Sequence, residues 1–146
     1  MKIAIGADHR GFQCKANIKQ YVVGSPDPIV WIDVGAYNEE RSDYPIFARA
    51  AVKAMQNRQA DLGILACGSG VGMAIVANRY RGMFAGVAWN EEIARASRED
   101  DNTNILVLPS DFISHEQAVA IVNAWLNARF KGGRYQERID MIDTMK

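Results

Sequence analysis

Short apolar runs alternate with amphipathic stretches along the chain. Five runs have the length and residue types of β-strands, at Lys2–Ala7, Ile29–Val34, Leu62–Cys67, Phe84–Trp89 and Asn104–Pro109. Each precedes a predicted helix, at Phe12–Val23, Ile46–Asn57, Met73–Arg79, Glu91–Glu99 and Glu116–Ala128, and a last helix is expected at Tyr135–Met145. This alternation predicts a three-layer α/β domain with a Rossmann-like, doubly wound sheet of five parallel strands and a C-terminal helix.

Several predicted strands are apolar on both faces. Ile3-Ala4-Ile5 and Ile105-Leu106-Val107-Leu108 are examples, and this pattern is typical of parallel strands that helices cover on both sides. Breaks at residues 24–28 and 38–45 are too short to separate domains, so residues 1–146 are expected to form one domain. Ligands of such sheets bind beyond the carboxyl ends of the strands, where the winding direction reverses.

The charge of the chain is balanced, with 17 basic and 17 acidic residues. No overall field favours nucleic acid or an anionic membrane, so neither is expected as a partner. The chain enters its first strand without a signal sequence and lacks the roughly 20 apolar residues of a membrane span, which predicts a cytoplasmic protein. Cys14 and Cys67 form no Cys-x-x-Cys pair, and His9 and His115 lack metal-ligand spacing. Reduced thiols, no metal and no cofactor are therefore expected.

The third predicted strand ends in a thiol and a glycine-rich turn. Cys67 is followed by Gly68, Gly70 and Gly72, whose missing side chains let backbone N–H groups converge on an anion where the next helix begins. The same helix start is expected to lower the thiol pKa. A thiolate beside N–H donors suits proton abstraction next to a carbonyl, because the enediolate that forms needs fixed donors around its oxygen.

Two other interpretations of this segment compete with a reactive thiol. A cysteine at the end of a buried strand can serve as a small apolar filler. The glycines also begin a dinucleotide-binding fingerprint, but the third falls at Gly72, where the spacing requires position 73. No Gly-Lys-Ser/Thr follows, so a P-loop is excluded.

Two acidic side chains follow the first two predicted strands. Asp8, with His9 after it, would lie beside Cys67 if the first and third strands are neighbours. The alternative is that Asp8 caps the next helix while His9 faces solvent. Asp33 could bind the ribose of a dinucleotide, but the first turn lacks the matching glycines.

Motifs at several separate places occur in the same order as in a known family. They are Gly6-Ala7-Asp8-His9-Arg10-Gly11-Phe12, Ser42-Asp43-Tyr44-Pro45, Cys67-Gly68-Ser69-Gly70-Val71-Gly72-Met73, Ala77-Asn78, Asn102-Thr103-Asn104 and Gly132-Gly133-Arg134-Tyr135-Gln136-Glu137-Arg138. In these motifs the chain resembles the type B ribose-5-phosphate isomerases, which form one family with the galactose-6-phosphate isomerase subunits. The resemblance covers nearly the whole chain.

The resemblance implies roles for the matching residues. It implies Cys67 as the base that moves a proton between C1 and C2, with Ser69 near the sugar oxygens. The implied substrate-binding residues are Asp8 and Tyr44 for the sugar, Gly68, Gly70, Val71 and Gly72 for the anion hole, and His9, Arg134 and Arg138 for the phosphate. Arg134 and Arg138 are four positions apart, so a helix would place them on one face. From composition alone they would be solvated surface charges.

The resemblance also implies an obligate homodimer, alone or as a dimer of dimers. In that dimer the arginines and the segment before the fifth strand reach the site of the neighbouring subunit. Many family members carry a His-Asn pair where this chain has Asp100-Asp101, and the histidine is credited with opening the sugar ring. Asp100 could accept the ring hydroxyl proton, although as an anion it could not donate one to the ring oxygen. Asp101 is expected to bind substrate beside it.

Two further points qualify this interpretation. The alternative for Asp100 and Asp101 is that they cap or solvate the turn before the fifth strand. Pro109-Ser110-Asp111 stands where relatives carry an arginine, which predicts weaker phosphate binding or a different substrate.

These residues together predict a metal-free aldose–ketose isomerase of a sugar phosphate. Ribose 5-phosphate and ribulose 5-phosphate, in the pentose phosphate pathway, are the expected pair, interconverted through a cis-enediol. The alternatives are another sugar phosphate, such as galactose 6-phosphate or an acyclic tetrose phosphate, or a non-catalytic binding module or partner subunit. Cys67, Ser69 and the paired Arg134 and Arg138 argue against a silent subunit, because such a subunit has no physical need for a thiol at an anion hole.

Overall fold

Five parallel strands form the central sheet: β1 Lys2–Ala7, β2 Val30–Asp33, β3 Leu62–Cys67, β4 Ala85–Val87 and β5 Ile105–Pro109. A computed structural model describes residues 1–24 and 27–145 and places the strands in the order β2-β1-β3-β5-β4. The winding therefore reverses between β1 and β3, where Ala7 is the partner of Ala66. This order confirms the predicted doubly wound sheet and makes the first and third strands neighbours, which is the condition for Asp8 to lie beside Cys67.

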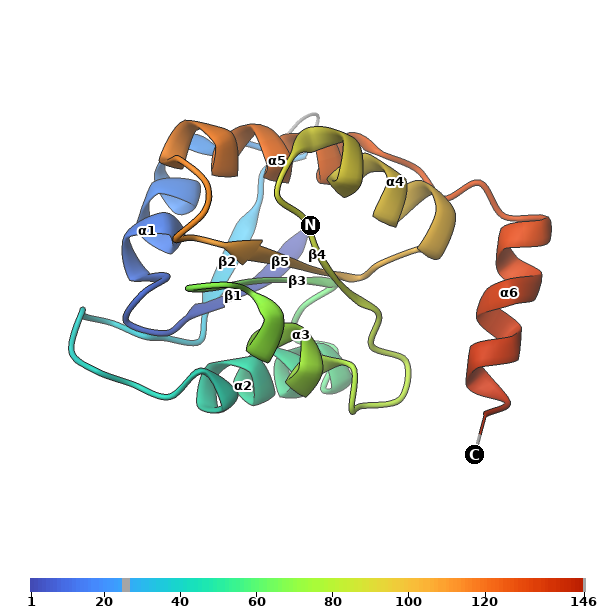
Figure 1. The fold of residues 1–146 in the computed structure, drawn as a ribbon, viewed down its shortest axis with the longest axis horizontal. Coiled ribbons are helices and arrows are strands. Elements are labelled where there is room, and N and C mark those ends of the chain that lie inside the picture. Colours follow the sequence, from blue (N-terminus) through green and yellow to red (C-terminus); the bar gives the residue numbers. More distant parts are fainter. Residues whose placement is uncertain (25–26, 146) are drawn as a thin grey trace.

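The described residues also form six helices: α1 Phe12–Tyr21, α2 Tyr44–Gln56, α3 Val71–Ala77, α4 Glu91–Asp101, α5 His115–Asn127 and α6 Arg134–Asp143. Helices α1, α4 and α5 cover one face of the sheet, and α2 and α3 cover the other (Figure 1). Each face has its own apolar core. The first is built around Trp125 and Ile18, and the second around Met73 and Val52, all fully buried. Burial on both faces explains why the strands read as apolar runs rather than as alternating ones.

Some predicted boundaries were wrong, each for a local reason. Helix α2 begins at Tyr44 rather than Ile46, because Pro45 is compatible with the first helical turn, where no N–H partner is needed. Helix α4 continues to Asp101 and ends at Asn102, which has a left-handed backbone with φ 48°. Asp100 and Asp101 therefore lie in the last turn of a helix, directly before the turn that leads to β5. The predicted break at 24–28 falls partly on residues 25 and 26, which lie outside the described residues.

Two motifs that carry the family resemblance have a structural role. The side-chain amide of Asn78 bonds both backbone groups of Ala85, at 2.9 and 2.8 Å. Asn104 accepts from the N–H of Phe84 at 2.9 Å and donates to the carbonyl of Gly82 at 2.8 Å. The two asparagines thus fix the connection between α3 and β4.

Helix α6 stands at one end of the domain, beyond the amino ends of the strands (Figure 1). Ile139 is buried there, whereas Met141, Ile142 and Met145 are 66%, 52% and 78% exposed. No helix among the described residues has the length and apolar character that a membrane crossing requires.

Candidate active site

Asp8 and Cys67 meet at the point where the winding of the sheet reverses. Asp8 follows β1, Cys67 ends β3, and the backbone N–H of Asp8 donates to the carbonyl of Ala66 at 3.3 Å. The buried carboxylate of Asp8 accepts the N–H groups of Arg10 and Gly11, both at 3.0 Å. Because Gly11 itself is the N-cap of α1, Asp8 closes the turn before the helix rather than capping it. These bonds hold one carboxylate in a fixed position beside the thiol.

The Cys67 thiol is buried, with 4% of the residue exposed. Burial raises its pKa, and the negative charge of Asp8 acts in the same direction. Backbone hydrogen bonds from Met73, Gly70 and Ser69 act to lower it. The net pKa lies above the ordinary value, so the prediction of a lowered thiol pKa was wrong: the N–H groups are present, but desolvation of the thiolate outweighs them.

The glycine-rich loop runs from Gly68 to Gly72. Gly70, the N-cap of α3, has a φ of 78°, a left-handed conformation that costs other residues about 1 kcal/mol or more. The exposed hydroxyl of Ser69 accepts the N–H of Val71 at 3.3 Å. This hydrogen bond and the left-handed backbone of Gly70 keep Ser69 at the surface of the loop, two residues after Cys67.

Two side chains pack directly on the glycines of this loop. A Cβ placed on Gly72 would lie 2.6 Å from Cζ of Tyr44, so the ring of Tyr44 rests on the start of α3. A Cβ on Gly68 would lie 2.6 Å from Nε of Arg10. The loop is thus contacted by a phenol and by a guanidinium, and in this arrangement neither glycine has space for a side chain.

His9 lies next to this loop and is held by Ser42. The backbone N–H of His9 donates to Oγ of Ser42 at 3.1 Å, and Nδ1 of His9 lies 3.2 Å from both the N–H and the carbonyl oxygen of Ser42. In the tautomer in which Nδ1 accepts the Ser42 N–H, Nε2 carries the proton and can donate to an anion; in the tautomer in which Nδ1 donates to the carbonyl, Nε2 is an acceptor. Neither Ser42 nor Arg10 is among the predicted site residues, although both stand in motifs that carry the resemblance.

The remaining predicted site residues lie at the opposite end of the sheet, toward the amino ends of the strands. Asp100, at the end of α4, pairs with Lys131 at 2.7 Å. The end of α4 leads into the amino end of β5, whereas Cys67 is the partner of Pro109 at the carboxyl end of β5. The strand between these two ends is about 13 Å long. The exposed Arg134 and Arg138 place their guanidinium groups 5.3 and 5.6 Å from the ring centre of Tyr135.

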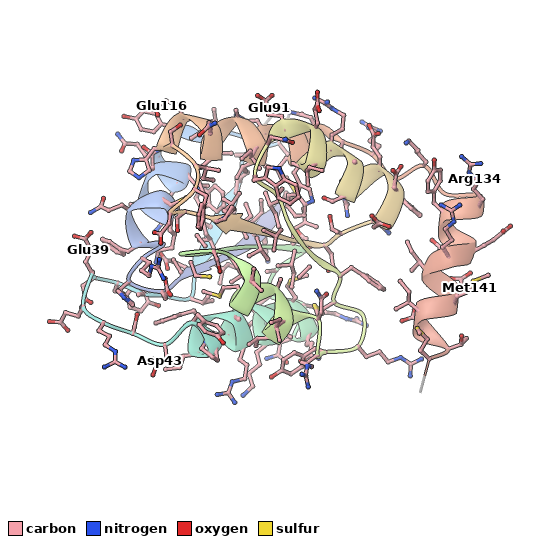
Figure 2. The ribbon with its side chains drawn as sticks, viewed as in Figure 1. Glu39, Asp43, Glu91, Glu116, Arg134 and Met141 are labelled. Carbon is pink, nitrogen blue, oxygen red and sulfur yellow. The ribbon has the colours of Figure 1, made fainter. Side chains whose placement is uncertain are left out.

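In Figure 2, Arg134 lies at the opposite end of the domain from Asp43, the residue before Tyr44, whose ring packs on the loop. Asp101 shares the last turn of α4 with Asp100. One chain therefore brings together Asp8, His9, Tyr44, Cys67 and the glycine loop, and it does not bring Asp100, Asp101, Arg134 or Arg138 to them.

Asp33 has a structural role in place of the ribose-binding one considered from the sequence. It accepts from Lys15 and Lys19, each at 2.7 Å, and from the N–H of Gly35 at 3.0 Å. Burial acts to raise the pKa of Asp33, but these hydrogen bonds outweigh it and lower the pKa. Its oxygens are thus already occupied by the protein.

Comparison with known proteins identifies the family of this chain. Residues 3–142 match the family described as Ribose/Galactose Isomerase. Ribose-5-phosphate isomerase B of Escherichia coli is 39% identical over 145 residues, which is 99% of this chain and 96% of that protein.

Two solved structures have the same fold. The ribose 5-phosphate isomerase of Thermotoga maritima has a TM-score of 0.93 at 44% identity, covering 99% of this chain and 98% of that one. Ribose-5-phosphate isomerase B of Mycoplasma genitalium, solved with bound ribulose-5-phosphate, has a TM-score of 0.87 at 38% identity and covers 97% and 93% of the two chains. The chain is an isomerase and belongs to the ribose/galactose isomerase family.

Proposed function

We propose that this enzyme interconverts ribose 5-phosphate and ribulose 5-phosphate, with Cys67 as the base. The observation that carries the proposal is the juxtaposition at the switch point: a buried thiol, a fixed carboxylate at Asp8, and backbone N–H groups of Ser69, Gly70 and Met73 directed at the sulfur. The names of the similar enzymes, one of them holding ribulose 5-phosphate, support the choice of substrate. We place the reaction in the pentose phosphate pathway, in the cytoplasm.

In this mechanism the thiolate of Cys67 removes the proton from C2 of the open-chain aldose. The electrons of the C2–H bond form the C1=C2 bond, the π electrons of the carbonyl move to O1, and the cis-enediol forms as its anion, in which the proton of the 2-hydroxyl passes to O1. The charge left on O2 then forms the C2=O2 bond, and the same sulfur returns its proton to C1. Its raised pKa makes the thiolate a stronger base while reducing the fraction present at neutral pH. The hydroxyl of Ser69 and N–H groups of the loop stabilise the oxygen that becomes negative.

The site is completed in this proposal by a second copy of the chain. Arg134 and Arg138 are exposed on α6, and Asp100 and Asp101 lie at the same end of the domain, away from Cys67. A homodimer in which this end of each subunit covers the Cys67 loop of the other forms two shared sites. The exposed apolar side chains of α6 suit burial in such a contact.

We propose that Arg134 and Arg138 bind the phosphate group of the substrate, because of the chemistry of their side chains. Two guanidinium groups on one helix face can bind the two charges of a phosphate, and His9 can add a third donor. Asp100 is proposed to accept the hydroxyl proton when the sugar ring opens, and Asp101 to contact the substrate beside it.

The aspartate at position 100 also supports a second candidate substrate. Because Asp100 cannot donate a proton to the ring oxygen, a sugar phosphate that has no ring, such as a tetrose 4-phosphate, would need no such donor. Galactose 6-phosphate is the other alternative substrate within the family. The alternative to an enzyme is a non-catalytic subunit.

The deciding experiment is an assay of the purified protein with ribose 5-phosphate, galactose 6-phosphate and erythrose 4-phosphate side by side, with EDTA present. We expect the highest kcat/KM with ribose 5-phosphate. The variant Cys67→Ser should lose at least about a hundredfold in kcat, because a hydroxyl is far too weakly acidic to act as the base, while its melting temperature stays close to that of the parent. Near-parent turnover by Cys67→Ser would remove the thiol from the mechanism.

A further inference from the structure

Arg10 lies on the loop that follows Cys67. A Cβ on Gly68 would lie 2.6 Å from its Nε and 2.7 Å from its Nη1, so its guanidinium rests on the backbone of Gly68 with no space for a side chain between them. Gly68 is the residue between Cys67 and Ser69. The charge of Arg10 is therefore placed on the residue that joins the proposed base to the exposed hydroxyl.

Asp111 holds this guanidinium in place. Its carboxylate pairs with Nη2 of Arg10, and its backbone N–H donates to the carbonyl of Gly68 at 3.0 Å. The hydroxyl of Ser110 lies 2.7 Å from the carbonyl of Cys67 and 3.3 Å from that of Arg10. Residues from three separate segments are thus connected around one point of the loop, and they fix the direction in which the guanidinium is presented.

Part of the hydrogen-bonding capacity of Arg10 is unused. Its side chain is 57% exposed, and only Nη2 donates to another described residue, so Nε and Nη1 have N–H groups available. An arginine side chain is always charged in proteins. Arg10 also follows His9, whose imidazole can donate from Nε2 in the tautomer in which Nδ1 accepts the N–H of Ser42. A cation with free donors, beside a second donor and next to the loop, is suited to a bound anion.

We propose that Arg10, aimed by Asp111, binds the phosphate group of the substrate from within the same subunit as Cys67. The inference rests on the proposed function and extends it to a residue that neither the sequence interpretation nor the family resemblance assigns. It gives each subunit a phosphate-binding charge of its own, in addition to those expected from a partner. The opposing explanation is that Arg10 and Asp111 only brace the loop.

The test compares Arg10→Ala, Arg10→Lys and Asp111→Asn with the matched control Arg49→Ala, an exposed arginine of α2. For each variant the kcat and KM for ribulose 5-phosphate, the inhibition constant of inorganic phosphate and the melting temperature are measured. We expect Arg10→Ala to raise KM and the phosphate inhibition constant together, by about tenfold, with a much smaller change in kcat. Lysine should recover only part of the loss, because an ammonium group lacks the two-pronged donor geometry, and Asp111→Asn should shift both constants in the same direction by less.

Two results would overturn the inference. One is a KM and a phosphate inhibition constant that stay within about twofold of the parent in Arg10→Ala. The other is a loss of kcat and melting temperature with phosphate inhibition unchanged, which is the behaviour of a brace. If the parent converts no sugar phosphate, the proposed function fails separately. Calorimetric titration with inorganic phosphate then decides whether Arg10 binds phosphate. Weaker binding of phosphate by Arg10→Ala than by the parent supports the inference, and equal or absent binding in parent and variant contradicts it.

Discussion

The carboxylate of Asp8 faces the thiol of Cys67 across the ends of β1 and β3, and its negative charge adds to the effect of burial in raising the thiol pKa. Replacing Asp8 by Asn removes that charge and keeps an oxygen that can accept the N–H groups of Arg10 and Gly11. The pKa of Cys67 should therefore fall. Since a thiolate forms when the pH exceeds the pKa, alkylation of Cys67 should begin at a lower pH in Asp8→Asn than in the parent.

The measurement is the rate of iodoacetamide modification of Cys67 between pH 6 and 10, followed by mass spectrometry. Cys14 serves as the internal control, because burial raises its pKa to about 12 and keeps it a thiol throughout this range. An alkylation profile that is unmoved, or that moves to higher pH, would mean that Asp8 does not act on the thiol through its charge.

Asp100→Asn tests ring opening. If Asp100 accepts the ring hydroxyl proton, the change should slow turnover of ribose 5-phosphate, which exists mainly as a ring, and spare erythrose 4-phosphate, which cannot form a furanose because its 4-hydroxyl is esterified. Conversion of ribulose 5-phosphate as far as the open-chain aldose should also be spared. Glu99→Gln is the matched control, since Glu99 is the other carboxylate near Lys131, at 3.5 Å. Equal losses for cyclic and acyclic substrates would assign Asp100 to the structure of the end of α4 instead.

Mixed dimers test whether two subunits share each site. Neither Cys67→Ser nor Arg134→Ala alone should retain normal sites, but a heterodimer of the two should collect both lesions in one site and leave the other intact. Its activity should return to about half that of the parent dimer. Purified heterodimers carrying two different affinity tags make the measurement direct. The absence of any recovery would show that each subunit builds a complete site from its own residues.

Gly72→Ala tests the contact between the loop and Tyr44. The added methyl group would lie 2.6 Å from Cζ of Tyr44, whose half-exposed ring can turn away. Because alanine also favours the helix by up to about 1 kcal/mol, stability should hardly change. The KM for ribose 5-phosphate should rise, and the further change to Tyr44→Ala on this background should add little to KM. Full, independent effects of the two substitutions on KM would show that they act at separate places.

Trp125→Phe tests the buried hydrogen bond of Trp125 in the first apolar core. The fully buried indole of Trp125 donates to Oγ1 of Thr103 at 2.9 Å. Phenylalanine removes the donor and leaves a small void, which should lower the free energy of unfolding by about 1–3 kcal/mol. Urea titration measures this, with Trp89→Phe as the control, because Trp89 is 54% exposed and its loss should cost about 0.5 kcal/mol or less. Equal costs at the two positions would contradict the role of the buried bond.

The sequence by itself determined the elements and their arrangement into a doubly wound parallel sheet. The reason is local: apolar spacing, turn residues and the alternation of strand with helix are properties of neighbouring positions. It also placed Asp8, His9 and Cys67 together, because each ends or follows a strand, and the carboxyl ends of parallel strands share one edge. The boundaries at Tyr44 and Asp101 were less certain, since helix ends depend on caps that several residues can provide.

Only the tertiary structure decided the balance of forces at the site and which distant residues meet there. The direction of the Cys67 pKa depends on how deeply the folded chain covers the sulfur, which no local motif records. Arg10 and Asp111 are far apart in sequence but form an ion pair on Gly68, because β1 and β5 both flank β3. The same topology takes the last turn of α4, which holds Asp100, and the start of α6, which holds Arg134, to the opposite end of the domain from the carboxyl end of β3, where Cys67 lies (Figure 1). These relationships arise from contacts between segments that are distant along the chain, and folding is what brings those segments together.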